Sequence, residues 1–272
     1  MTSGGLKASG YLPTYHLPAT GYELNEPTGP PFSHSRVEAY MSHMAAGATC
    51  AHVRENNGLL ADIERRGLIW IAERIPRRIN SDHLSALGLS AMLGSGLSFA
   101  AFALTPWAAW GVVLSLALNW FGDSLDGTLA RVRSHQRPRY GYYVDHVIDL
   151  AGATFLMTGL AFSGLMSPLI AAGVLAAYLL VSAETYLATH ARGVFRMSVL
   201  GFGPTELRIL LAIGALRAAY EPWVSLGPLG MLRLFDVGAV IAAASLAVIF
   251  AVSAARNTKA LYAAEPPPSR MK

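Results

Sequence analysis

Residues 123–149, DSLDGTLARVRSHQRPRYGYYVDHVID, carry four aspartates at the ends of two apolar segments. Asp123 and Asp126 are three residues apart, and Asp145 and Asp149 are four apart, so each pair lies on one face of a helix. Ionisable side chains beside long apolar segments are costly to bury and usually have a function. The stretch therefore predicts a functional site wherever the two faces meet.

The composition indicates a membrane protein. The chain has 272 residues, of which 53% are hydrophobic and 14% are charged, whereas soluble domains carry roughly 25% charged residues. The net charge of +4 fits basic cytoplasmic loops better than nucleic-acid binding. A single cysteine, Cys50, excludes an intramolecular disulfide and a thiolate-rich metal site.

Six apolar segments are long enough, at roughly 20 residues, to cross a bilayer. They cover residues 84–104, 107–120 with a helical continuation through the first aspartate pair, 141–165, 169–187, 206–224 and 235–254. Asp82 is expected to cap the first, and Arg217 makes the fifth the weakest. Residues 59–75, with Trp70 as an anchor, have the mixed apolar and charged periodicity of an interfacial helix. The predicted fold is all-α and integral to the membrane, with six transmembrane helices preceded by a cytoplasmic interfacial amphipathic helix.

The loop charges predict the orientation. Arginine and lysine are concentrated in alternate loops and at the C-terminus, so the positive-inside rule places both termini and the aspartates at the cytoplasmic face. In a bacterium this is the cell inner membrane. We expect residues 1–56 to form a disordered tail, 57–256 the membrane domain and 257–272 a cytoplasmic C-terminal tail.

The two aspartate-bearing segments are predicted to form a helical hairpin that turns near Gln136, with Pro138 ending the turn. Asp126 and Asp145 are then equally far from the turn, as are Asp123 and Asp149. Four adjacent carboxylates cannot all stay ionised without cations. Oxygen-only ligands suit magnesium, manganese or calcium, and two such ions could clamp a substrate phosphate.

The residues after the first aspartate pair favour a phosphate-bearing ligand. Gly127 and Ala130 are small enough for a ligand to approach the helix backbone, and Arg131 is positioned to contact a phosphate. Asn119 either supports the cluster or forms a hydrogen bond between helices. The structural alternative is that the aspartates pair with arginines and lock the hairpin.

This pattern resembles the signature of the CDP-alcohol phosphotransferases, also called CDP-alcohol phosphatidyltransferases. The matching positions are Asp123, Asp126, Gly127, Ala130, Arg131, Gly141, Asp145 and Asp149. The family's six membrane spans and preceding interfacial helix would cover about residues 57–256. One departure is the nine residues between Arg131 and Gly141, where the resemblance implies seven or eight.

The resemblance implies a reaction in phospholipid biosynthesis between a CDP-linked donor and an alcohol acceptor, with formation of a phosphodiester and release of CMP. The four aspartates would hold two Mg²⁺ or Mn²⁺ ions, and Gly127, Ala130, Arg131 and Gly141 would line the CDP site. Asp149 would be the general base. His146 competes for that role because a neutral imidazole suits neutral pH.

The identity of the substrates stays open at this point. Asp145-His146 resembles the pair in choline/ethanolamine phosphotransferases, whose acceptor is diacylglycerol, whereas the other branch joins CDP-diacylglycerol to a polar alcohol. The arginines and glutamate near the fourth and fifth spans either bind a polar acceptor or anchor the helices; they are Arg192, Arg196, Glu206 and Arg208.

Two further predictions concern function and assembly. The alternative function is a cation transporter that uses the aspartate cluster as its ion site. The small residues Ala151, Gly152 and Ala153 favour close helix packing and a homodimer.

Overall fold

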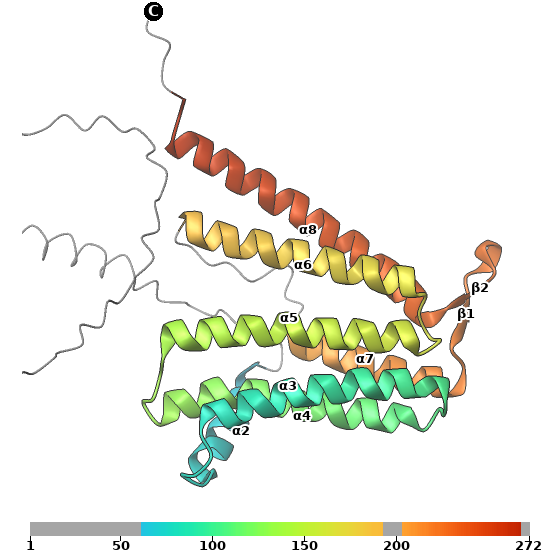
Figure 1. Ribbon diagram of the computed structural model, residues 1–272, viewed down its shortest axis with the longest axis horizontal. Coiled ribbons are helices and arrows are strands. Elements are labelled where there is room, and N and C mark those ends of the chain that lie inside the picture. Colours follow the sequence, from blue (N-terminus) through green and yellow to red (C-terminus); the bar gives the residue numbers. More distant parts are fainter. Residues whose placement is uncertain (1–60, 193–202, 268–272) are drawn as a thin grey trace, which may run out of the picture. The chain divides into compact units, whose positions relative to one another are not determined.

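The computed structural model describes residues 61–192 and 203–267 (Figure 1), all within one structural unit, Cys50–Lys272. The predicted N-terminal tail, residues 1–56, and Arg196 lie outside the described residues.

Helices make up most of the described chain (Figure 1). They are α2 (Ala61–Arg74), α3 (Ser81–Ala100) with the 3₁₀ turn η1 (Ala101–Ala103), α4 (Ala108–Val132), α5 (Pro138–Phe162), α6 (Pro168–Arg192), α7 (Pro204–Tyr220) and α8 (Leu234–Ala264). Three of them begin at a proline, whose missing N–H and fixed φ suit the first helical position.

Three local features differ from the sequence-based expectation. Asn80, rather than Asp82, caps α3: its Oδ1 accepts from the His83 N–H at 3.0 Å, and its own N–H donates to His83 Nδ1 at 3.2 Å. The last helix continues to Ala264, beyond its apolar run. The loop before it contains an antiparallel hairpin of β1 (Trp223–Ser225) and β2 (Met231–Arg233), with the 3₁₀ turn η2 (Gly227–Leu229) between them.

Four of the described helical segments are long and apolar enough to cross a membrane: Ser81–Ala103, Pro138–Phe162, Pro168–Arg192 and Leu234–Ala264. Helix α4 has 25 residues, but Asn119, Asp123 and Asp126 lower its hydropathy. Helix α7 has only 17 residues and contains Arg208 and Arg217. The structure therefore supports an all-α membrane protein.

Successive helices run in alternate directions, as contacts at their ends demonstrate. Arg137, just before α5, pairs with Asp82 in the first turn of α3, so these two helices begin at the same end. At the other end, the backbone N–H of Ser167, next to the start of α6, donates to Asp236 Oδ1 in the first turn of α8 at 2.6 Å. Figure 1 shows α6 and α8 side by side.

Helix α3 packs against both α4 and α5, and glycines allow the close approach. A Cβ added to Gly122 of α4 would lie 2.8 Å from the backbone N of Gly88 in α3. A Cβ on Gly159 of α5 would lie 2.0 Å from the carbonyl oxygen of Gly96. Backbones in such contact leave no space for a side chain, so α3 fixes the separation of the two aspartate-bearing helices.

Helix α2 is attached to the aspartate end of the bundle. Its buried residues Leu68 and Ala72 join Leu84, Leu125 and Leu129 in a small core cluster, while Trp70 keeps 58% of its surface exposed. Arg133, directly after α4, donates to the carbonyls of Ile75 at 2.8 Å and Pro76 at 3.2 Å. The linker between α2 and α3 is thereby tied to the end of α4.

Candidate active site

The predicted hairpin between α4 and α5 is present, with its turn at residues 133–137. Helix α4 ends where the His135 N–H donates to the Ala130 carbonyl at 2.9 Å and Ser134 adopts a φ of 55°. This left-handed conformation is typical of a helix C-terminus. Pro138 starts the second arm. The turn is mostly exposed.

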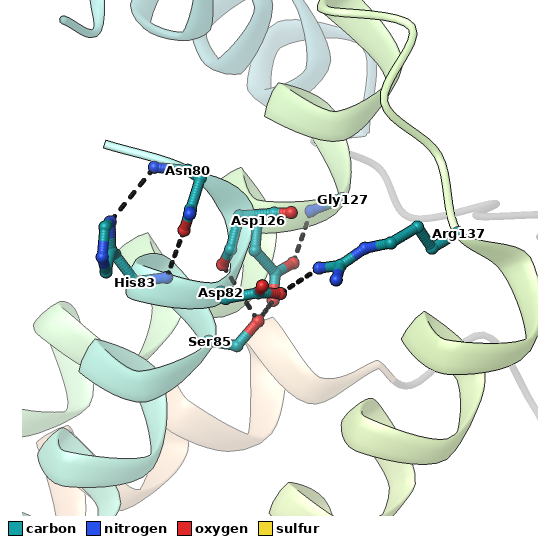
Figure 2. Close-up of polar contacts among 8 residues, drawn as sticks. Asn80, Asp82, His83, Ser85, Asp126, Gly127 and Arg137 are labelled. Atoms are coloured by element: carbon teal, nitrogen blue, oxygen red, sulfur yellow. Dashed lines mark hydrogen bonds and ion pairs between the residues drawn. The ribbon is translucent and has the colours of Figure 1, made fainter. Parts of the chain in front are cut away.

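Asp126 is held in place from α3. Its Oδ2 accepts a hydrogen bond from Ser85 Oγ at 2.6 Å, and its Oδ1 accepts from the Gly127 N–H at 2.5 Å. Figure 2 shows the Ser85 hydroxyl directed at this carboxylate, with Asp82 and Arg137 nearby. The carboxylate also interacts electrostatically with Asp123 and with Asp145. Asp126 of the first pair is therefore close enough to Asp145 of the second pair to interact with it electrostatically across the hairpin.

Asp123 belongs to a polar network that joins three helices. Arg208 of α7 donates from Nη2 to Asp123 Oδ2 at 2.7 Å and from Nε to Asn119 Oδ1 at 2.7 Å. The Asn119 amide in turn donates to the Gly88 carbonyl of α3 at 3.0 Å. Asn119 thus has the interhelical role that was one of its two predicted roles. One aspartate does pair with an arginine, but this arginine lies on α7 and not in the hairpin.

Asp145 and Asp149 face α6 as well as α4. Both carboxylates interact electrostatically with the side chains of Tyr178 and Tyr186. Ser182 lies one helical turn from each tyrosine and makes side-chain hydrogen bonds with both. The second aspartate pair therefore lies within electrostatic range of hydroxyl groups on α6.

His146 is buried, and its Nδ1 lies 2.6 Å from the Tyr142 carbonyl oxygen. Its ring packs between Tyr142, at a centroid distance of 4.1 Å, and Tyr186, at 5.0 Å. Tyr186 also interacts electrostatically with Asp145 and Asp149. The predicted direction of the His146 side chain, away from these aspartates, stays a prediction.

The residues expected to line the CDP site are spread over both arms. The Arg131 guanidinium donates to Thr128 Oγ1 at 3.0 Å, and its Nη1 would lie 3.5 Å from a Cβ on Gly127. Ala130 lines a cavity of about 400 Å³ together with Asn80, Ser81, Asp82, Leu129, Arg133, His135, Gln136 and Arg137. Gly141 lies exposed in the first turn of α5, with nothing within 4 Å of a Cβ at that position.

The acidic groups suit a divalent cation by donor type. Carboxylate oxygens are the ligands that magnesium and manganese prefer, and neighbouring like charges favour binding of a cation. Across residues 61–192 and 203–267, however, no three His, Cys, Asp or Glu side chains converge closely enough to hold a metal ion. Asp123 instead points to Arg208 and Asp126 to Ser85.

Some residues of the site could not be found by motif. Ser85 precedes Asp126 by 41 positions and belongs to another helix. Tyr178 and Tyr186 form a helical pattern with Ser182, but this pattern gains meaning only once α6 packs on α5. Arg208 was a candidate for acceptor binding or anchoring, and its pairing with Asp123 was not foreseen.

Comparisons with known proteins concern the family and the fold. Residues 85–252 match the family model named CDP-alcohol phosphatidyltransferase. The fold is similar to the crystal structure of Mycobacterium tuberculosis phosphatidylinositol phosphate synthase (PgsA1) with CDP-DAG bound, with a TM-score of 0.51 and 17% identity. The alignment covers 76% of this chain and 99% of that one. Among curated proteins, none matches this chain.

Proposed function

Because the chain belongs to the CDP-alcohol phosphatidyltransferase family, we propose that its α4–α5 acidic site transfers a substituted phosphate from a CDP-alcohol to an alcohol acceptor and releases CMP. Membership makes the protein a membrane CDP-alcohol phosphotransferase of phospholipid synthesis. The observation that carries the proposed site is the electrostatic interaction of Asp126 with both Asp123 and Asp145, because it joins the two halves of the acidic motif.

The family uses divalent metal ions, and we assign their binding here to Asp123, Asp126, Asp145 and Asp149. When bound, two Mg²⁺ or Mn²⁺ ions would neutralise the donor's phosphates. The chain's own contribution is to hold the carboxylates in position. Ser85 fixes one oxygen of Asp126, and Arg208 fixes one oxygen of Asp123.

The assignment of the CDP site rests on the cavity beside Ala130 and on the basic residues at the same end. Arg131 carries its guanidinium over Gly127, where a cation can bind a phosphate. Gly141, exposed on the opposite arm, offers a surface without a side chain. We assign Gly127, Ala130, Arg131 and Gly141 to donor binding.

We assign the general base to Asp149. It would take the proton of the acceptor hydroxyl, the acceptor oxygen would bond to phosphorus, and the bond from phosphorus to the CMP oxygen would break. His146 is less suited because its ring is buried between two tyrosines and its Nδ1 faces a backbone carbonyl.

The donor we favour is CDP-diacylglycerol, with a polar alcohol as acceptor. The support is that the solved neighbour spanning 76% of this chain has CDP-DAG bound. CDP-choline or CDP-ethanolamine with diacylglycerol as acceptor is the second candidate, which the Asp145-His146 pair favours.

We also propose that all six helices from α3 to α8 cross the membrane, within a domain of residues 57–256. Helices α3 and α5 begin at the same end, so α4 must return through the same thickness, and its 25 residues span about 37 Å. Helix α2 would lie in the interface with Trp70 in the headgroups. The arginines near the aspartates favour a cytoplasmic site, with residues 257–272 at the same face.

A homodimer stays a prediction. Gly152, one of the small residues that suggested it, packs within the chain, since a Cβ there would lie 3.0 Å from Met92 Cγ of α3. Its neighbours Ala151 and Ala153 are half-buried.

The test incubates purified protein with Mg²⁺ and two substrate pairs and measures CMP release. One pair is CDP-diacylglycerol with a panel of polar alcohols, and the other is CDP-choline or CDP-ethanolamine with diacylglycerol. We expect CMP from the first pair only. CMP from the second pair alone would overturn the proposed donor, and cation flux in liposomes without CMP from any pair would establish the transporter alternative.

The matched variants are Asp126→Asn and Glu184→Gln. Both replace a carboxylate by an amide, but Glu184 accepts from Ser253 and Asn257 of α8 and lies outside the acidic motif and the Ala130 cavity. We expect Asp126→Asn to lower kcat by at least about 100-fold, the scale of a lost electrostatic contact to the transition state. Glu184→Gln should retain most activity. Equal activity of both variants would show that the acidic motif is structural.

A further inference from the structure

The hydroxyl groups of α6 opposite the acidic site are not explained by donor or metal binding. Tyr178, Ser182 and Tyr186 follow one another at intervals of four residues and therefore lie on one face of the helix. All three are half-buried. Polar side chains of membrane helices usually face the protein interior and form hydrogen bonds, so this stripe is a candidate binding surface.

The stripe is directed at the second aspartate pair. Both tyrosines interact electrostatically with Asp149 and with Asp145, and Ser182 makes side-chain hydrogen bonds with both tyrosines. The edge of the Tyr186 ring also packs on His146, with ring centroids 5.0 Å apart. The hydroxyl groups of α6 and the proposed base on α5 therefore lie within electrostatic range of each other.

A groove opens beside the end of this stripe that carries Tyr186. The groove has a volume of about 410 Å³ and is lined by Tyr142, Tyr143, His146, Val147, Leu150, Tyr186, Thr189 and His190. Tyr186 belongs both to the groove and to the stripe. The Ala130 cavity shares no lining residue with this groove. The two openings are therefore separate.

We propose that the Tyr178–Ser182–Tyr186 stripe is the acceptor-binding wall of the site and holds the acceptor hydroxyl against Asp149. This proposal rests on the proposed function. The group that the stripe would bind is the hydroxyl of the alcohol acceptor. The tyrosine hydroxyls contact the acceptor oxygen, while Ser182 is a positioning residue that sets the orientation of both phenols. The acceptor proton passes to the Asp149 carboxylate as its oxygen bonds to phosphorus and CMP leaves.

The experiment measures KM for acceptor and donor separately, with whichever substrate pair releases CMP in the wild-type protein. Tyr186→Phe and Tyr178→Phe each remove one hydroxyl and keep the ring. We expect the acceptor KM to rise about three- to tenfold, the effect of one lost hydrogen bond, with the donor KM unchanged. Ser182→Ala should also raise the acceptor KM, and Ser182→Thr, which keeps the hydroxyl, should restore it.

The matched control is Thr185→Val on the same helix. Its hydroxyl donates to the Val181 carbonyl at 2.9 Å, so its loss should change neither KM. An unchanged acceptor KM in the tyrosine variants, or an equal rise in both KM values, would overturn the acceptor wall. If Tyr186→Phe does not fold, Ser182→Ala and Ser182→Thr provide the test instead: an acceptor KM that is unchanged in Ser182→Ala, or that rises equally with the donor KM, would overturn the acceptor wall. Absence of CMP release by the wild-type protein with every pair would instead overturn the proposed function.

Discussion

The Asp123 carboxylate and the Arg208 guanidinium form a charge pair that is mostly shielded from solvent. Their side chains are 23% and 15% exposed, respectively, and Arg208 Nε donates to Asn119 at the same time. Breaking a shielded pair by removing one partner leaves the other without its counter-charge, which costs more than the pair itself contributes. Arg208 is thus expected both to stabilise the bundle and to orient Asp123.

Arg208→Gln should lower the free energy of unfolding in detergent by about 1–3 kcal/mol, the cost of a lost charged hydrogen bond. Arg217→Gln is the control on the same helix, because its guanidinium is exposed and contacts only the Glu221 carbonyl within the described residues. Chemical denaturation of both variants, and of Asp123→Asn with and without Arg208→Gln, checks this. Purely additive effects of the two changes would contradict a direct pair.

Helix α3 determines the distance between the two aspartate-bearing helices because it packs on each through glycine. At the crossing with α5, Gly96 and Gly159 bring two backbones into contact. A methyl group added there has only backbone to displace, and backbone cannot rotate away as a side chain can. A change at this crossing should therefore move α5 relative to α4 and disturb the site from a distance.

Gly159→Ala should destabilise the protein by about 1–3 kcal/mol, the usual cost of overpacking, and should also reduce CMP release. The control is Gly173→Ala in α6, where nothing lies within 4 Å of the added Cβ and where alanine favours the helix by up to about 1 kcal/mol. Thermal unfolding in detergent and the CMP assay measure both effects. Wild-type stability of Gly159→Ala would contradict the close crossing.

The positions of the helices are predictable from the sequence, because each long apolar run is a helix and the prolines and charged residues that flank it indicate its ends. Pro138 and Pro168 begin α5 and α6. The end of α8 was missed because Arg256 and Lys259 end the apolar run, although both residues are good helix formers outside lipid. The three-residue strands β1 and β2 are too short for a period of two to be recognised.

The candidate site also contains residues that the sequence predicts and residues that it does not. Fixed spacing on two helices predicts the four aspartates and their partners in the motif as the site, because this spacing expresses their chemistry, and their roles stay a prediction. Ser85, the Arg208 pairing and the α6 tyrosines were not predictable, since each depends on which helix packs beside the hairpin. Charge at the start of α7 alone could not distinguish a partner of Asp123 from an anchor at the headgroups.

At the scale of the whole molecule, two helices that begin at the same end of the bundle must be joined by a segment that runs back to that end. Helices α6 and α8 begin together through Ser167 and Asp236 and stay together near their other ends, where Glu184 accepts from Ser253 at 2.7 Å and Asn257 at 2.6 Å. The chain between α6 and α8 must therefore run back to the end where both helices begin. Within the described residues, α7 is the helix of this segment. Its 17 residues span about 26 Å, slightly less than the roughly 30 Å of a bilayer core.

Cysteine labelling tests this topology in a Cys50→Ser background, which removes the native thiol. Leu104→Cys and Gln136→Cys lie at exposed positions beyond the two ends of α4, and Ser225→Cys lies on β1 between α7 and α8. With a membrane-impermeant maleimide, Gln136→Cys should react only in inside-out vesicles, because the arginines around it favour the cytoplasmic side. The other two should react only in right-side-out vesicles, because α4 and α7 each cross between them and the cytoplasm. Labelling of Leu104→Cys and Gln136→Cys from the same side would mean that α4 does not span the membrane, and would contradict the proposed depth of the acidic site near the cytoplasmic face.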